Sequence, residues 1–350
     1  MVILKNSGKF AAKSITVAIM RKKAKNLLFQ ALKIIFSVGL IYWLVQSGKL
    51  NFKALANLLQ PQYLIPAFLL VGANMYLTSE RWRILLQTQS HHLPSWRTFK
   101  LTMIGIFFNF AVPGGVGGDL VKAFYFSKDH PESKMAAATS VLMDRVLGLY
   151  AMILMALFAM IFDWSLVQSN NTLHVLWLVI LGLFTAATLG LGLIFSQKLY
   201  DRGSVKRRLE KLPLHSKTVR IYESLHLYGR NYKNLIGSIA ISLIGQTFSI
   251  TFMILAGHAS GLGTEMSWAT YFLVAPLGFM ATAIPISPAG VGVGQAAFYF
   301  LFNIYTGHAT DLGPTVITAL QVAQFVFGLL GAFFYMQRKE RVPYEEVNQS

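Results

Sequence analysis

Long apolar runs separated by polar segments constrain this chain more than any other feature. Six runs hold the roughly 20 mostly apolar residues that a helix needs to cross the hydrocarbon core of a bilayer. They cover 27–46, 62–79, 136–162, 172–195, 234–256 and 313–336. Only 13% of the residues are charged, whereas soluble domains carry about 25%. The pattern predicts an all-α, polytopic membrane protein with about six full transmembrane helices.

The positions of Lys and Arg predict how these spans are oriented. Segments 1–26 and 196–233 carry seven and ten basic residues. The segments 163–171, 257–267 and 307–312 carry none. Because short cytoplasmic loops are rich in Lys and Arg, we expect the first two segments in the cytoplasm and the other three outside. Both termini, including the tail 337–350, are then cytoplasmic.

The net charge of +17 lies outside the apolar runs. In a soluble protein such a charge would suggest nucleic acid. Here it is better explained by membrane orientation and by anionic lipid headgroups, so we expect membrane lipids as partners and no nucleic acid. The basic loop 196–233 is expected to hold an interfacial helix on anionic lipid.

Two further apolar stretches, 99–121 and 268–306, are interrupted by Pro and Gly. The basic segments on both sides of 99–121 are expected in the cytoplasm, so this stretch must enter the membrane and return. By the same reasoning, 268–306 begins and ends outside. Its length suits either a deep re-entrant hairpin or two short crossings.

The two interrupted stretches resemble each other. Pro113-Gly114-Gly115-Val116-Gly117 is followed 175 residues later by Pro288-Ala289-Gly290-Val291-Gly292. The same shift lays 62–79 over 234–256, and 136–162 over 313–336. An odd number of crossings in each half inverts the second half. The sequence therefore predicts two inverted membrane repeats, 27–162 and 163–336, whose interrupted helices face a cavity, as in many secondary transporters.

Asp119 follows the glycines of the first interrupted stretch. We expect Gly117 and Gly118 to belong to the turn and Asp119 to lie near the start of the returning helix, where a carboxylate complements the helix dipole. The free backbone N–H groups of such a helix end also favour a phosphate. The alternative is that Asp119 only caps the helix.

Asp144 and Arg145 lie about two turns into the run 136–162. A charge at the bilayer centre costs roughly 2.5–3.5 kcal/mol, so such residues usually face the interior of the helix bundle. Adjacent side chains on a helix do not face each other, so each of the two needs another partner. Arg145 suits a phosphate, and Asp144 suits Lys122 or a substrate ammonium. The alternative is a structural ion pair that holds this span to the re-entrant segment.

The remaining polar residues have weaker signals. Glu80, Arg81 and Arg83 end the second span and are expected to be interfacial anchors. Gln295 lies in the second interrupted stretch, where its side chain can face the cavity. The chain has no cysteine and no histidine spacing typical of a metal site, so we expect neither a metal nor a cofactor.

At these residues the chain resembles the transmembrane, flippase-like domain of lysylphosphatidylglycerol synthases, including its stand-alone members. The matching stretches are Pro113-Gly-Gly-Val-Gly-Gly-Asp119 with Lys122, Asp144-Arg145 with Gly148, and Pro285-Ile-Ser-Pro288-Ala-Gly-Val-Gly292. Together they extend over nearly the whole chain. The family often has Arg at the position of Lys122, and Glu near Gln295. Gln lacks the charge that would recognise a cationic headgroup there.

The resemblance implies a multi-pass protein of the bacterial cytoplasmic (inner) membrane that moves an anionic or aminoacylated phospholipid between leaflets. No soluble domain follows the last span, so we do not expect synthase or other enzymatic activity. The expected headgroup site comprises Arg145, Asp144, Asp119, Lys122, Gly117, Gly118 and Gln295. The expected re-entrant turns comprise Pro113, Gly114, Gly115, Pro288, Gly290 and Gly292.

Two alternatives to translocation stay open. The chain is either a membrane component of lipid aminoacylation or lipid-linked glycan synthesis, or a scaffold for envelope synthesis that transports nothing. A separate lipid-modifying enzyme is a candidate partner, and the sequence does not predict the oligomeric state.

Overall fold

The computed structural model describes residues 56–111, 117–201, 215–264 and 266–339, together with Tyr42, Gly203 and Arg207. Every regular element in these residues is a helix, which confirms the all-α prediction. The segment 1–26, the predicted span 27–46 apart from Tyr42, and the predicted turn residues Pro113, Gly114 and Gly115 lie outside the described residues.

Ten helices build most of the described structure. They are α3 (Pro61–Thr88), α4 (Ser95–Ala111), α5 (Gly117–Asp129), α6 (Lys134–Phe162), α8 (Asn171–Phe195), α11 (His215–Arg230), α12 (Tyr232–Ser260), α13 (Trp268–Thr282), α14 (Val293–Thr306) and α15 (Leu312–Lys339). Five short elements connect them: η1 (Asn57–Leu59), η2 (Pro131–Ser133), α7 (Trp164–Ser169), α9 (Gln197–Asp201) and η3 (Pro288–Gly290).

Four of the described helices are long and apolar enough to cross a membrane, namely α6, α8, α12 and α15. They coincide with four of the predicted spans. The helix α3 contains the predicted span 62–79 but continues to Thr88 and carries charged residues in its second half. These helices confirm a polytopic membrane protein. The count of about six spans and the cytoplasmic position of both termini stay predictions.

Local sequence signals account for several helix ends. At the start of α8, the Asn170 side chain accepts hydrogen bonds from the backbone N–H groups of Thr172 and Leu173, at 3.0 and 3.3 Å. The helices α12 and α14 end at Gly261 and Gly307, whose φ angles are 75° and 74°. Glycine reaches this left-handed conformation without steric cost, which is why it commonly follows the end of a helix.

Both interrupted stretches form pairs of short helices. The pair α13 and α14 begins and ends at the predicted limits 268–306, with η3 between the two helices. The helices α4 and α5 begin at Ser95 and end at Asp129, so the pair extends beyond both predicted limits, 99 and 121. The apolar run ends near 121, but the helix continues because Lys122 and Phe126 are buried against its neighbours. Each short helix has at most 17 residues, fewer than the roughly 20 that a crossing needs.

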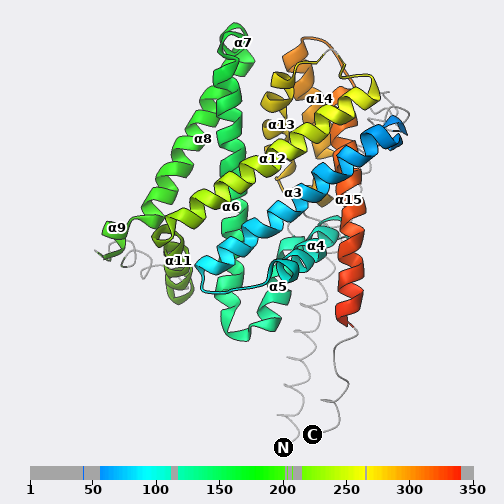
Figure 1. Cartoon of the computed structure of the whole chain (residues 1–350). Coiled ribbons are helices and arrows are strands. Elements are labelled where there is room, and N and C mark those ends of the chain that lie inside the picture. The colour runs from blue at the N-terminus through cyan, green and yellow to red at the C-terminus, as the bar shows by residue number, and fades with distance from the viewer. Residues whose placement is uncertain are drawn as a thin grey trace, which may run out of the picture.

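The two halves of the chain meet where α3 packs along α12. The two helices lie side by side and run in opposite directions, as Figure 1 shows. Side-chain hydrogen bonds set their register: Asn74 to Ser249 at 2.9 Å, Arg81 to Ser242 at 2.9 Å, and Asn234 to Thr88 at 3.0 Å.

Several further contacts between helices of the first half have a counterpart in the second half. The short helix α4 of the first half packs on α15 of the second half, and α13 of the second half packs on α6 of the first. Within each half, α5 packs on α6 and α14 packs on α15. In Figure 1 the pair α13 and α14 lies towards one end of the molecule, while α4 and α5 lie towards the other.

The helix α8 lies at one side of this bundle, packed on α6, α7 and α11 (Figure 1). Its exposed large apolar side chains are Val175, Leu178, Val179, Leu183, Leu189 and Leu193, and Leu173 and Ile180 are buried. Such a surface suits the hydrocarbon of a bilayer, where a helix satisfies its own backbone. The helix α11 lies within the basic segment 196–233, where the sequence predicted an interfacial helix, and its Tyr228 is fully buried.

Candidate functional site

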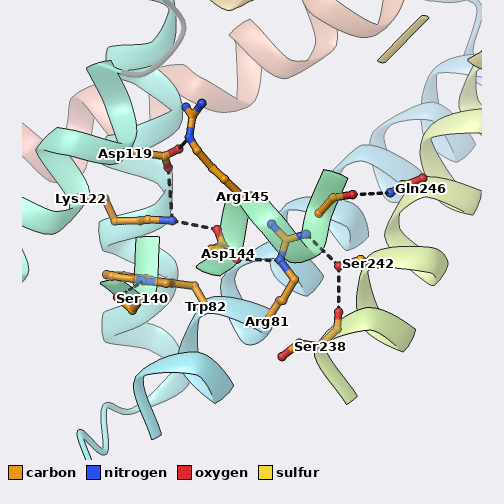
Figure 2. A network of polar contacts seen from close by, with 11 residues as sticks. Arg81, Trp82, Asp119, Lys122, Ser140, Asp144, Arg145, Ser238, Ser242 and Gln246 are labelled. Carbon is orange, nitrogen blue, oxygen red and sulfur yellow. Dashed lines mark hydrogen bonds and ion pairs between the residues drawn. The ribbon is translucent and has the colours of Figure 1, made fainter. Parts of the chain in front are cut away.

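A chain of ion pairs connects three helices at the centre of the molecule. It consists of Arg81 from α3, Asp119 and Lys122 from α5, and Asp144 and Arg145 from α6 (Figure 2). The five charges alternate in sign along the chain, beginning and ending with an arginine. We call these five residues the ion-pair network.

Each carboxylate of the network contacts two cations. Asp144 accepts a hydrogen bond from Arg81 Nε at 2.7 Å through Oδ1 and contacts Lys122 Nζ at 3.3 Å through Oδ2. Asp119 contacts Lys122 Nζ at 3.4 Å through Oδ1 and accepts from Arg145 Nε at 2.5 Å through Oδ2. Charged hydrogen bonds of this kind are about twice as strong as neutral ones.

The helical geometry explains why adjacent residues have different partners. Asp144 and Arg145 point about 100° apart around α6, so Asp144 faces α3 and α5 while Arg145 reaches the start of α5. The predicted contact of Asp144 with Lys122 is present. The predicted ion pair between this span and the re-entrant segment is present as well, formed by Arg145 and Asp119.

Burial differs strongly along the network. The side chains of Lys122 and Asp144 are 3% and 7% exposed, whereas that of Arg145 is 36% exposed. Lys122 Nζ also lies 4.5 Å from the centre of the Trp82 ring, a favourable cation–π distance. Lys122 and Asp144 therefore stabilise the packing of three helices, and Arg145 is the network's most accessible cation.

The prediction that Arg81 is an interfacial anchor is wrong. Its guanidinium is only 15% exposed and lies between Asp144 and Ser242. Gly148, one turn after Asp144, provides space for the Arg81 guanidinium, because a Cβ on Gly148 would lie 3.2 Å from Arg81 Nη1. Glu80 and Arg83 pair with each other instead.

A signal for Arg81 was present in the sequence. Asn74, Thr78 and Arg81 recur at spacings of four and three residues, so they share one face of α3. The residues opposite them on α12, Ser242 and Ser249, follow the same kind of spacing.

A cavity of about 520 Å³ opens beside the network. All five network residues line it, together with residues of α3, α4, α12, α13, η3 and α15, so both halves of the chain contribute. Its neutral polar lining consists of Asn74, Thr78, Thr102, Asn109, Ser242, Gln246, Ser249, Thr282, Gln321 and Gln324. The volume is in the range of ordinary ligand sites, about 300–1,000 Å³.

The glycines at the start of α5 permit a very close helix contact. Asp119 lies in the first turn of α5 as predicted, but Gly117 and Gly118 are the first two residues of this helix and not part of the turn. Neither glycine is among the residues that line the cavity. A Cβ on Gly118 would lie 1.8 Å from the carbonyl oxygen of Gly105 on α4. The Gly118 N–H donates to Asn109 Oδ1 at 3.0 Å. Gly118 thus brings α5 against α4 and places Asp119 at the cavity.

The second interrupted stretch also depends on glycine. Pro288 and Gly290 lie in η3, and Gly292 precedes α14. The φ angles of Gly290 and Gly292 are 72° and 84°, a region that residues with a Cβ rarely adopt. Gly290 lines the cavity.

Gln295 lies behind the cavity wall and not in it. It is 1% exposed, its Oε1 accepts from the Gly292 N–H at 2.7 Å, and its Nε2 donates to Thr318 and Gln321 at 3.0 and 2.7 Å. Gln321 in turn donates to the carbonyl oxygen of Ala289 at 3.3 Å and lines the cavity. The geometry therefore gives Gln295 a supporting position behind Gln321.

No group of three or more His, Asp or Glu side chains with metal-binding geometry occurs among the described residues. The charges at the cavity are instead compensated by one another.

Comparisons with known proteins place the chain in a membrane family. The family described as "Lysylphosphatidylglycerol synthase TM region" matches residues 30–332. A similar protein is the "UPF0104 membrane protein MJ1595" of Methanocaldococcus jannaschii, 29% identical over 99 residues, which is 28% of this chain and 30% of that protein. No solved structure matches the chain. Because the family match covers most of its length, the chain belongs to the family of the lysylphosphatidylglycerol synthase transmembrane region.

Proposed function

We propose that this protein moves a lipid with an anionic headgroup between the two leaflets of a membrane. The observation that carries the proposal is a cavity that holds charged groups with a net positive charge and is lined by helices from both halves of a membrane protein. The headgroup occupies the cavity while the acyl chains stay in the bilayer.

The charge of the cavity favours an anion. Three cations and two carboxylates line it, which leaves a net charge of +1 among the described lining residues. A phosphodiester carries one negative charge and would make the site neutral. The partly exposed Arg145 can offer its planar guanidinium to phosphate oxygens, which it suits better than lysine does. Charged groups inside a membrane bundle commonly mark the path of a substrate.

The matched helix contacts support two inverted repeats, 27–162 and 163–336, which stay a prediction. Exchanging α3 with α12, α4 with α13, α5 with α14 and α6 with α15 turns each packing contact among these eight helices into another contact among them. Inverted repeats with interrupted helices around a central site are typical of transporters that alternate access to the two sides. A rocking motion of one repeat against the other would expose a headgroup first to one leaflet and then to the other.

The family supports the proposal further, because it is named for the membrane region of lysylphosphatidylglycerol synthases. The proposed location is the cytoplasmic membrane of a bacterium. The proposed partners are membrane lipids and a separate lipid-modifying enzyme. We propose no catalytic role for the chain itself.

Headgroup accessibility in proteoliposomes tests the function. Purified protein is reconstituted with a trace of fluorescent phosphatidylglycerol, and dithionite is added outside. Translocation predicts faster and fuller quenching than in empty vesicles, and loss of this excess with Arg145→Ala. Equal quenching with and without protein would exclude translocation of this lipid and favour the component or scaffold alternatives.

A further inference from the structure

The carboxylates of the cavity indicate which headgroups it accepts. We infer that the substrate is a phosphodiester lipid whose headgroup carries neutral hydroxyl groups and no ammonium group. This inference rests on the proposed function and specifies its substrate class.

Each of the two carboxylates among the described cavity residues contacts two cations. Asp144 is bonded to Arg81 and Lys122, and Asp119 to Lys122 and Arg145. An ammonium group on a headgroup would add a third cation to a carboxylate that already contacts two, at a site of net charge +1. A cationic aminoacyl headgroup would also be repelled by that charge, because like charges interact strongly at low dielectric.

Amide and hydroxyl groups lie among the apolar side chains in the rest of the wall. On α12, Gln246 lies across the network from Asp119 and Lys122, as Figure 2 shows. Asn74 from α3 and Gln321 from α15 also line the cavity. Amide side chains present both donors and acceptors, which matches the dual character of a hydroxyl group.

Gln246 has an acceptor that no described protein group uses. Its Nε2 donates to the carbonyl oxygen of Gly148 at 3.3 Å. Its Oε1 is buried without a hydrogen-bond partner, and the residue is only 9% exposed. A buried acceptor left without a partner is costly, and a headgroup hydroxyl that donates to Gln246 Oε1 would remove this cost. An ester or alkyl headgroup of the same charge would not.

Two lipid sources share this chemistry: phosphatidylglycerol, and a sugar linked to a polyprenyl chain through one phosphate. Both carry one phosphodiester charge and neutral hydroxyl groups. Binding by detergent-solubilised protein separates recognition from transport. The probes are short-chain phosphatidylglycerol, phosphatidylethanol, lysyl-phosphatidylglycerol and a short polyprenyl-phosphate hexose, each measured by isothermal titration calorimetry.

Phosphatidylethanol is the matched control ligand, because it has the charge of phosphatidylglycerol but no hydroxyl group. We expect phosphatidylglycerol or the polyprenyl-phosphate hexose to bind about two- to tenfold more tightly than phosphatidylethanol, the effect of one net hydrogen bond. Lysyl-phosphatidylglycerol should bind more weakly than either. Whichever of the two hydroxylated lipids binds more tightly identifies the source. Glycerophosphoglycerol, which has no acyl chains, should bind more weakly than the lipid; equal affinity would identify a water-soluble ligand and overturn the lipid assignment.

The matched variants are Gln246→Met, which removes the amide from the cavity, and Gln62→Met, which makes the same change on the exposed part of α3. Gln246→Met should abolish the preference over phosphatidylethanol, and Gln62→Met should retain it. Equal binding of both lipids by the unaltered protein, or a retained preference in Gln246→Met, would overturn the role of Gln246. Tighter binding of lysyl-phosphatidylglycerol would overturn the inference.

Transport is then measured with the same lipids in proteoliposomes. The proposed translocation and the inferred headgroup selectivity can then be refuted independently of each other. Selective binding without any translocation supports the inferred headgroup and refutes the proposed function. Translocation of all lipids at one rate supports the proposed function and refutes the inferred selectivity.

Discussion

Asn74 on α3 donates a hydrogen bond to Ser249 on α12 at 2.9 Å, and the two residues are 175 positions apart. The same shift relates Pro113 to Pro288 in the sequence. If two inverted repeats are related by a twofold axis, a residue that contacts its own counterpart lies on that axis. The bond between Asn74 and Ser249 therefore marks where the axis would cross the bundle.

Cysteine cross-linking tests this register in a chain that has no native cysteine. A protein with Asn74→Cys and Ser249→Cys should cross-link with a short thiol-reactive reagent, because the two side chains are in contact. The control pairs Asn74→Cys with Ser238→Cys, which lies 11 residues before Ser249 in α12, a displacement of roughly 16 Å along the helix. Mobility on a denaturing gel reports the cross-link. Efficient cross-linking of the control pair would contradict the register.

Asp144→Asn should destabilise the protein. The substitution keeps the shape, but it removes the carboxylate that pairs with Arg81 and leaves Lys122 with Asp119 alone. Breaking a buried ion pair costs about 3–5 kcal/mol, so the melting temperature in detergent should fall clearly. Because Lys122 and Asp144 are in direct contact, the double variant Asp144→Asn with Lys122→Met should lose less than the sum of the single losses. Additive losses would show that the two residues are not coupled.

Arg145→Ala should impair translocation much more than it impairs stability. Its side chain is 36% exposed and Asp119 keeps Lys122 as a partner, so the expected loss of stability is at most about 1 kcal/mol. Translocation of a phosphodiester lipid should fall at least tenfold, which corresponds to roughly 1.4 kcal/mol. Dithionite quenching and thermal unfolding measure the two effects.

Arg97→Ala is the control for Arg145→Ala. Arg97 pairs with Asp129 at 3.0 Å on the exposed side of α4, outside the cavity lining. Translocation by this variant should equal that of the unaltered protein. Equal losses in both variants would indicate a general effect of surface charge and not a headgroup contact.

Gly118→Ala should prevent the native contact of α4 with α5. The added Cβ would lie 1.8 Å from the Gly105 carbonyl oxygen, and backbone must move to relieve this overlap. Overpacking typically costs 1–3 kcal/mol, so about 3 kcal/mol is expected here, measured by thermal unfolding. Gly237→Ala on α12 is the control, because its Cβ would meet no atom within 4 Å. It should be neutral or stabilising by up to about 1 kcal/mol. Equal stability of the two variants would contradict the tight crossing.

The stability of the protein should fall as the pH drops below 6.5. Burial, and then the nearby His130, lowers the pKa of His91 from its ordinary 6.5, in the connection between α3 and α4. Below that pH, His91 binds more protons in the unfolded chain than in the folded protein. Its contribution to the free energy of unfolding is therefore fully present above pH 6.5 and is lost as the pH falls. His91→Gln should flatten the melting temperature between pH 5 and 7, a range set about the ordinary histidine pKa. An unchanged slope would exclude His91 as the cause.

Much of the site was predictable, because the cost of burying a charge identifies the residues that need partners. Asp119, Lys122, Asp144 and Arg145 were expected at the cavity, and the structure brings all four together. Arg81 was expected at the interface, because it follows the apolar run 62–79 in the sequence. The helix continues to Thr88 since Leu85 and Leu86 are fully buried, and this carries Arg81 into the bundle.

Gln246 and Gln295 show that a sequence does not predict which neighbours a polar side chain contacts. Their positions on α12 and α14 say nothing of which neighbour each side chain meets. Packing against α6 directs Gln246 to Gly148 at the cavity, whereas α15 engages Gln295 through Thr318 and Gln321 behind the wall.

The sequence by itself determined the properties that depend on local composition and order along the chain. These are the long apolar helices, the two interrupted stretches and the charges that cannot stay unpaired in a membrane. Only the tertiary structure decided which charge meets which, because partners such as Arg81 and Asp144 lie on different helices and meet only through the packing of the bundle. It also decided that two carboxylates are each compensated by two cations. That balance depends on distances between helices, which no local pattern contains.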